Sequence, residues 1–223
     1  MSEIDEELER IEKEVEHDYN LRKLGFWKLV TKIKKDPQLA RLVEQAGRIE
    51  RKASEKKVRL RINIWLGHAA EISAMLLGIM LIWLGFAHSS ELTRSLSLVL
   101  ASVILSMSVH PLAHYAVGRF YGINFLYYFL NGPAKIEPTL KIDYASYLKA
   151  HPRKRAAMHL AGPIVTISAT LTCLVLGLVA SILQWAKILL LLYFLFTLAT
   201  DIFLSPKAGD IKRVKREWQI NKI

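Results

Sequence analysis

Four long apolar runs constrain the fold of this 223-residue chain more than any other feature. A helix needs about 20 mostly apolar residues to cross the hydrocarbon core of a bilayer. Runs of that kind occupy residues 62–87, 95–117, 159–183 and 187–204. Backbone polar groups have no water partner in lipid, so such runs fold as helices. We therefore expect an all-α polytopic membrane protein with about four transmembrane helices, its membrane domain spanning residues 61–206.

The region before the first span, residues 1–60, is charged and amphipathic and is expected to form cytoplasmic helices. Apolar residues recur there at three- and four-residue steps, which predicts a short helix; they are Ile4, Leu8, Ile11 and Val15. Residues 21–35 form a second amphipathic segment, which is basic. Two interpretations of this segment are open: it lies on an anionic membrane surface, or it packs on its acidic neighbour as a helical hairpin.

Residues 119–158, between the second and third spans, are rich in aromatic residues, glycine and proline. The Asn131-Gly132 pair separates two β-prone runs, a pattern typical of a hairpin. Nearby prolines favour edge strands. We expect a small β element here, and a basic tail over residues 207–223.

The distribution of lysine and arginine predicts the orientation in the membrane. Basic residues precede the first span, lie between the second and third, and follow the fourth, whereas the other two loops hold only Arg94 and Lys187. Both termini and the middle segment should therefore be cytoplasmic. The net charge of +11 is distributed as this topology requires and not as one basic stripe, which argues against nucleic-acid binding.

A pair of histidines, His110 and His114, ends the second span. Residues four apart lie on one face of a helix, about 6 Å apart along its axis, so both imidazoles can reach one metal ion. The spacing is that of the HExxH zinc helix. Pro111 occupies the position at which a zinc hydrolase keeps its glutamate base.

The predicted topology places further ionisable residues at the level of this pair. Such residues inside a membrane usually face the bundle interior and mark a functional site. They are His68 and Glu71 in the first span, Asp201 near the end of the fourth, and Asp210 shortly after it. We therefore predict one shared polar site on the cytoplasmic side.

In order along the chain, these features resemble the membrane-embedded zinc metalloproteases of the site-2 protease family. The resemblance covers about residues 68–213 and rests on four motifs in chain order. They are the histidine pair followed by Gly118-Arg119-Phe120-Tyr121-Gly122-Ile123, the Gly/Pro-containing strand region, Ala161-Gly162-Pro163, and Pro206-Lys207-Ala208-Gly209-Asp210. It implies that His110, His114 and Asp210 bind zinc and that Gly162-Pro163 takes the family's Gly-Pro position. The chain departs from the family at Pro111 and at Ile211, where a glycine usually follows the aspartate.

Three functional hypotheses follow. In the first, the protein hydrolyses membrane segments with a replacement base, for which Glu71 is the first candidate and Asp201 the second; an extended substrate would then pair with the strand region. In the second, the protein is a pseudoprotease, a scaffold that binds transmembrane partners without cleaving them. In the third, the polar layer conducts protons or ions; this hypothesis is disfavoured because four spans make a small pathway without broken half-helices.

Overall fold

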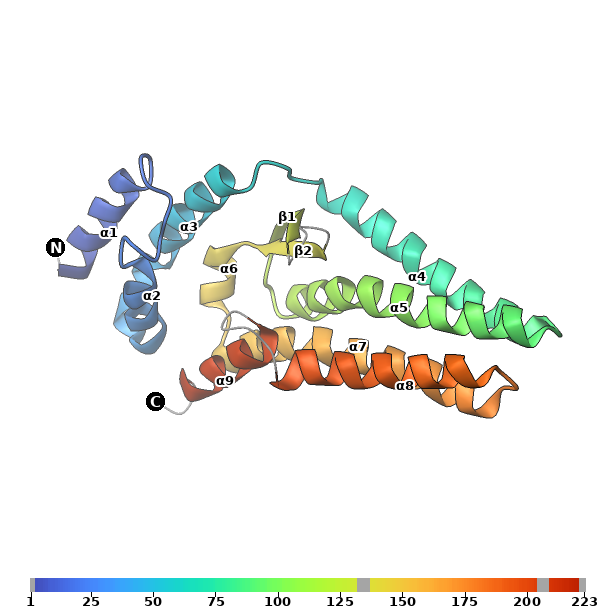
Figure 1. The fold of residues 1–223 in the computed structure, drawn as a ribbon. Helices are drawn as coiled ribbons and strands as arrows, with labels where there is room; N and C mark the ends of the chain where they lie inside the picture. Colours follow the sequence, from blue (N-terminus) through green and yellow to red (C-terminus); the bar gives the residue numbers. More distant parts are fainter. Residues whose placement is uncertain (1–2, 132–136, 204–208, 221–223) are drawn as a thin grey trace. The chain divides into compact units, whose positions relative to one another are not determined.

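The computed structural model describes residues 3–131, 137–203 and 209–220, and four long apolar helices dominate it (Figure 1). Each is long and apolar enough to cross a membrane, which confirms the expected all-α polytopic fold. They are α4 (Ile64–Ala87), α5 (Glu91–Phe120), α7 (Pro152–Val179) and α8 (Gln184–Leu198), the last continued by the π-helical turn η2 (Ala199–Phe203). Helices α5 and α7 begin at Glu91 and Pro152, before the predicted spans, because polar residues that precede the apolar runs are also helical.

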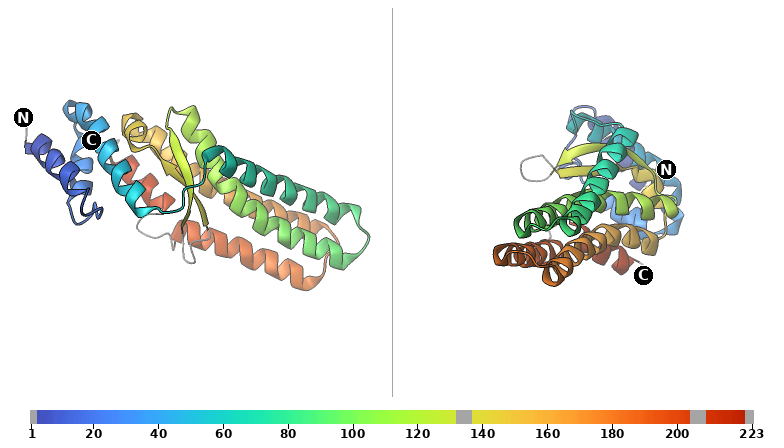
Figure 2. Two further views of the ribbon diagram at one scale, coloured as in Figure 1. Left: turned by 90° about the horizontal axis from the view of Figure 1, so that it is seen from above. Right: turned by 90° about the vertical axis from the view of Figure 1, so that its right-hand side faces the viewer.

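The chain divides into two compact units. One contains Trp65–Val117 and Ala156–Arg216, and the other Met1–Ile64, Gly118–Arg155 and Glu217–Ile223. In the first unit, α5, α7 and α8 run alongside one another, and α4 is inclined to them and approaches α5 toward its C-terminal end (Figure 1 and Figure 2). Buried apolar side chains between them form a core that includes Leu98, Leu105, Cys173, Leu174 and Leu190.

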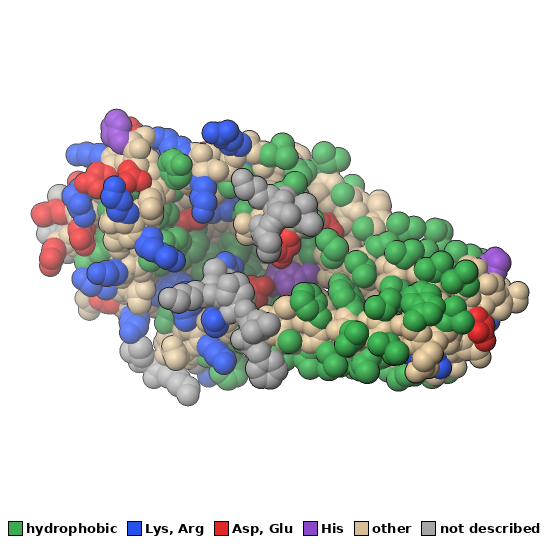
Figure 3. All heavy atoms as spheres, in the orientation of Figure 1, with side chains coloured by type: hydrophobic (Ala, Val, Ile, Leu, Met, Phe, Trp, Pro, Cys, Tyr) green, Lys and Arg blue, Asp and Glu red, His purple; other side chains and the backbone are tan. Residues whose placement is uncertain are grey.

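Apolar side chains gather over the long helices on the face that Figure 3 shows. Large hydrophobic residues such as Leu76, Val175 and Phe196 are exposed there. Water would disfavour such a surface, whereas lipid chains would not. The first unit is therefore suited to a bilayer.

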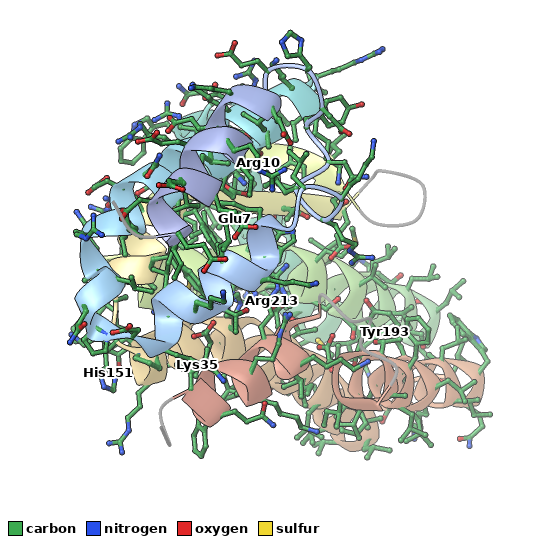
Figure 4. The ribbon with its side chains drawn as sticks, turned by 90° about the vertical axis from the view of Figure 1, so that its left-hand side faces the viewer. Glu7, Arg10, Lys35, His151, Tyr193 and Arg213 are labelled. Carbon is green, nitrogen blue, oxygen red and sulfur yellow. The ribbon has the colours of Figure 1, made fainter. Side chains whose placement is uncertain are left out.

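The second unit contains the N-terminal helices α1 (Glu3–Glu14), α2 (Phe26–Lys35) and α3 (Val43–Lys57), with a 3-10 turn, η1 (Pro37–Leu42), before α3. The apolar face of α2 is buried against protein, with Phe26 fully buried and Ile33 5% exposed. Helix α1 packs on α2 and exposes a charged face with Glu7 and Arg10 (Figure 4). Of the two interpretations of the basic segment, the structure therefore supports packing as a helical hairpin.

The strand region also belongs to the second unit. Strands β1 (Phe125–Asn131) and β2 (Glu137–Ile142) pair antiparallel, as the sequence predicts; most of the expected turn lies outside the described residues. On the other edge of β1, the backbone of Ile62 exchanges two hydrogen bonds with Tyr128. A short helix, α6 (Tyr144–Lys149), follows β2 and packs on α3.

The C-terminal region forms one further helix, α9 (Asp210–Ile220), where the sequence predicted only a basic tail. Its first part lies in the unit of the long helices, and its last part, from Glu217, in the other. The first residue of α9 is Asp210, the aspartate that the family resemblance predicts as a zinc ligand.

Candidate metal centre

The structure brings the three predicted ligands together in the unit of the long helices. The Nε2 atoms of His110 and His114 lie 3.0 Å apart. One carboxylate oxygen of Asp210, Oδ2, lies 3.4 Å from the first and 3.2 Å from the second. Histidine and acidic side chains are visible next to each other in the space-filling view (Figure 3). The three ligating atoms lie within 4.8 Å of one another, close enough to hold one metal ion.

Hydrogen bonds on the far side of each ring fix which nitrogen carries the proton. His114 Nδ1 lies 2.7 Å from the carbonyl oxygen of Met158, which can only accept, so this nitrogen donates. His110 Nδ1 lies 2.9 Å from the Thr166 hydroxyl, which itself donates to the carbonyl oxygen of Ser106 at 3.5 Å. The hydroxyl therefore accepts from His110. In the neutral form of both rings, the Nε2 atoms carry lone pairs.

The consequence is that three acceptor atoms converge on one point. Two imidazole lone pairs and a carboxylate oxygen repel one another unless a cation or a proton lies between them. A donor set of two nitrogens and one oxygen suits zinc, and outer hydrogen bonds from the ligating histidines are characteristic of zinc sites. The residues present therefore fit a zinc ion.

Gly162 allows α7 to pass directly beside the two imidazoles. A Cβ atom at this position would lie 2.8 Å from His110 Nε2 and closer still to His114 Nε2. Any larger residue would push the rings away from the point they share. The glycine of the Gly-Pro pair thus has a steric role at the centre.

The structure adds a histidine that the sequence had not pointed to. His159 on α7 is buried, and its Nδ1 lies 3.0 Å from the Oδ1 atom of Asp210. In the sequence, His159 lies near the start of the third span, where histidines are common at a membrane boundary, so its position alone did not predict a role at the centre. Its spacing from Gly162 and Thr166, three and seven residues, places all three on one face of α7, and this was the signal available.

Asp210 is surrounded by imidazoles. Its burial favours the neutral acid, whereas hydrogen bonds from histidine N–H groups favour the carboxylate and hold the pKa of its carboxyl below the usual range. With the Nε2 atoms of His110 and His114 unprotonated, the ring that donates to this carboxylate is His159. Arg213, one turn later on α9, has a guanidinium nitrogen 4.0 Å from Oδ1 (Figure 4). The carboxylate is therefore ionised and available as a ligand.

Pro111 lies inside α5, and the helix continues through it to Phe120. The position next to His110 thus presents a pyrrolidine ring and no carboxylate. Proline also has no backbone N–H, so Pro111 itself supplies neither a base nor a hydrogen-bond donor.

The two candidates for a replacement base lie elsewhere in the same unit. Glu71 is buried on α4, one turn after His68, whose ring centroid lies 4.0 Å from that of Tyr115. Tyr115 projects from α5 about 140° away from His110. Among the described residues, the group of ligating atoms includes neither Glu71 nor Asp201, which lies in η2. Their catalytic role remains a prediction.

No protein-family model, no curated protein and no solved structure matches this chain.

Proposed function

We propose that this protein is a zinc-binding, multi-pass membrane protein of the site-2 protease type that binds membrane segments without hydrolysing them. One observation carries the proposal: His110, His114 and Asp210 present acceptor atoms at a single point, while Pro111 replaces the residue that would activate water. Such a centre would bind zinc but would lack the glutamate that takes a proton from the metal-bound water.

Zinc is the metal that this donor set favours. Two imidazole nitrogens and a carboxylate oxygen, each supported by an outer hydrogen bond, are the usual surroundings of this ion. Bound zinc acts as a Lewis acid toward a carbonyl oxygen or water. All three proposed zinc ligands are side chains of this protein. Gly162 approaches the two imidazoles so closely that α7 leaves little space beside them for a further ligand.

Each unit offers a surface that suits a membrane-segment partner. In the unit of the long helices, exposed apolar side chains offer a transmembrane helix of a partner protein a lipid-like surface. In the other unit, the sheet formed by the described residues has two strands, β1 and β2, and an extended peptide would pair with the edge of β2 that faces away from β1. Loss of the base costs orders of magnitude in rate but leaves such surfaces intact.

The proposed orientation places both termini and the strand region in the cytoplasm. Lysine and arginine flank the cytoplasmic ends of the spans in the proposed arrangement. The histidine pair, near the end of α5, then lies toward the inner side of the membrane.

Metal content tests the proposal. Purified wild-type protein should contain about one zinc per chain, the stoichiometry of a single centre, and the His110→Ala/His114→Ala variant should contain none. His88→Ala is the matched control, because His88 is exposed in the loop after α4. Wild-type protein that binds no zinc would overturn the proposal.

A cleavage assay separates the binding protein from the enzyme. A panel of reconstituted transmembrane substrates should remain intact with zinc-loaded wild-type protein. Cleavage by wild-type protein that is abolished in Glu71→Gln would instead identify an active protease with Glu71 as its base.

A further inference from the structure

We infer that His159 is a positioning residue that holds Asp210 so that only one carboxylate oxygen faces the histidine pair. The inference deepens the proposed function and rests on it. It assigns a role to a buried histidine that the zinc ligands alone leave unexplained.

The two oxygens of Asp210 have different partners. Oδ2 faces the Nε2 atoms of His110 and His114 at 3.4 and 3.2 Å. Oδ1 lies 3.0 Å from His159 Nδ1. A carboxylate can only accept, so the Nδ1–H of His159 donates to Oδ1. With Oδ1 occupied in this way, Asp210 binds a metal through Oδ2 alone.

The histidine is the fixed member of this pair. The side chain of His159 is 3% exposed, against 21% for Asp210. His159 is on α7, one of the long helices, whereas Asp210 is the first residue of α9. The hydrogen bond from His159 therefore ties Asp210 to a buried position on a long helix, and a hydrogen bond to a charged acceptor is among the stronger ones.

His159 acts through Asp210 and not as a ligand. Its Nδ1 is directed at Oδ1, and the group of ligating atoms within 4.8 Å of one another consists of His110, His114 and Asp210. Its ring centroid lies 6.3 Å from that of His114. The arrangement is that of an outer hydrogen bond that orients a metal ligand.

Zinc competition titrations and the visible spectrum of the cobalt(II)-substituted protein test the inference. The variants are His159→Ala, which removes the donor, and His159→Asn, which keeps an N–H donor near the position of Nδ1. His88→Ala again serves as the matched control, and thermal unfolding in detergent shows whether each variant is folded.

We expect His159→Ala to bind one zinc with about 10- to 100-fold lower affinity and to change the cobalt spectrum, because Asp210 loses its orientation. His159→Asn should restore both the affinity and the spectrum toward wild type. A purely structural role predicts no rescue of the spectrum by asparagine.

Two results with a zinc-binding wild-type protein would overturn the inference alone. One is a His159→Ala variant indistinguishable from wild type. The other is a folded His159→Ala variant that loses its stoichiometric metal completely, as expected for His110→Ala/His114→Ala, which would make His159 a ligand. Wild-type protein without zinc is a different outcome: it removes the proposed function, and the role of His159 with it.

Discussion

The Nε2 atoms of His110 and His114 lie 3.0 Å apart, and the Nδ1–H group of each ring donates a hydrogen bond to an acceptor on α7. Two lone pairs at that distance are unfavourable without a cation between them. The folded centre should therefore bind metal far better than the unfolded chain does.

Metal removal should accordingly destabilise the protein. A ligand present at 100 times its Kd stabilises the native state by about 2.7 kcal/mol. We expect a strong chelator to lower the melting temperature of the wild-type protein in detergent and to leave that of His110→Ala/His114→Ala unchanged. An equal decrease in both proteins would show that the chelator acts elsewhere.

The close approach of Gly162 leads to a second prediction. A Cβ atom there would lie 2.8 Å from His110 Nε2, so Gly162→Ala should displace the imidazoles and lower zinc affinity at least about tenfold, the size of an outer-contact loss. Gly85→Ala is the matched control, because its Cβ would meet its neighbours at 3.5 Å or more. Isothermal titration with zinc compares the two, and equal affinities would contradict the steric role.

Thr166 provides a third prediction. Its hydroxyl accepts from His110 Nδ1 at 2.9 Å, so Thr166→Val, which keeps the shape and loses the acceptor, should weaken zinc binding about 10- to 100-fold. Thr166→Ser keeps the hydroxyl and should bind like wild type. Thr172→Val, on the exposed side of α7, controls for the loss of a helix hydroxyl. Competition with a colorimetric chelator gives the affinities, and a valine variant as tight as the serine variant would exclude this contact from the centre.

The proposed topology is tested by cysteine labelling. The native Cys173 is buried in the helical core, so it should give little background. Tyr19→Cys, before α2, should react with a membrane-impermeant maleimide only after the cells are opened, and Ser89→Cys, between α4 and α5, should react in intact cells. The opposite pattern would invert the orientation and place the centre toward the outer face.

Much of this architecture follows from local patterns in the sequence. Apolar runs predict the four long helices, and the β-prone runs beside Asn131 predict the strand pair, because both depend on residues close together in the chain. Helix α9 was not predicted, although Ile211, Val214 and Trp218 recur at helical spacing, because the segment was interpreted from its charge alone. The histidine spacing and the family resemblance pointed to His110, His114 and Asp210. The contact between His159 and Asp210 joins residues 51 positions apart, and no local pattern encodes such a contact.

The other end of α9 carries a buried ion cluster, which makes the stability of the N-terminal unit dependent on pH. Glu217 contacts Lys34 Nζ at 2.5 Å, Arg155 Nε at 2.6 Å and the Tyr147 hydroxyl at 2.9 Å. Its burial opposes ionisation, but the two cations hold the pKa of its carboxyl below the usual value. Removing one partner of a buried ion pair costs about 3–5 kcal/mol, so Glu217→Gln should lower the melting temperature at pH 7.

The pH dependence of that difference has a definite sign. A carboxyl whose pKa is lower in the folded state stabilises it fully above the unfolded pKa, about 4.3 for glutamate, and this contribution is lost as the pH falls through the folded pKa. The gap in melting temperature between wild type and Glu217→Gln should therefore be widest near pH 7 and shrink below about pH 4. Glu55→Gln is the control, because Glu55 pairs with Arg51 on the surface, where such a pair contributes about 0–1 kcal/mol. A gap that stays constant across this range would show that Glu217 contributes through packing and not through its charge.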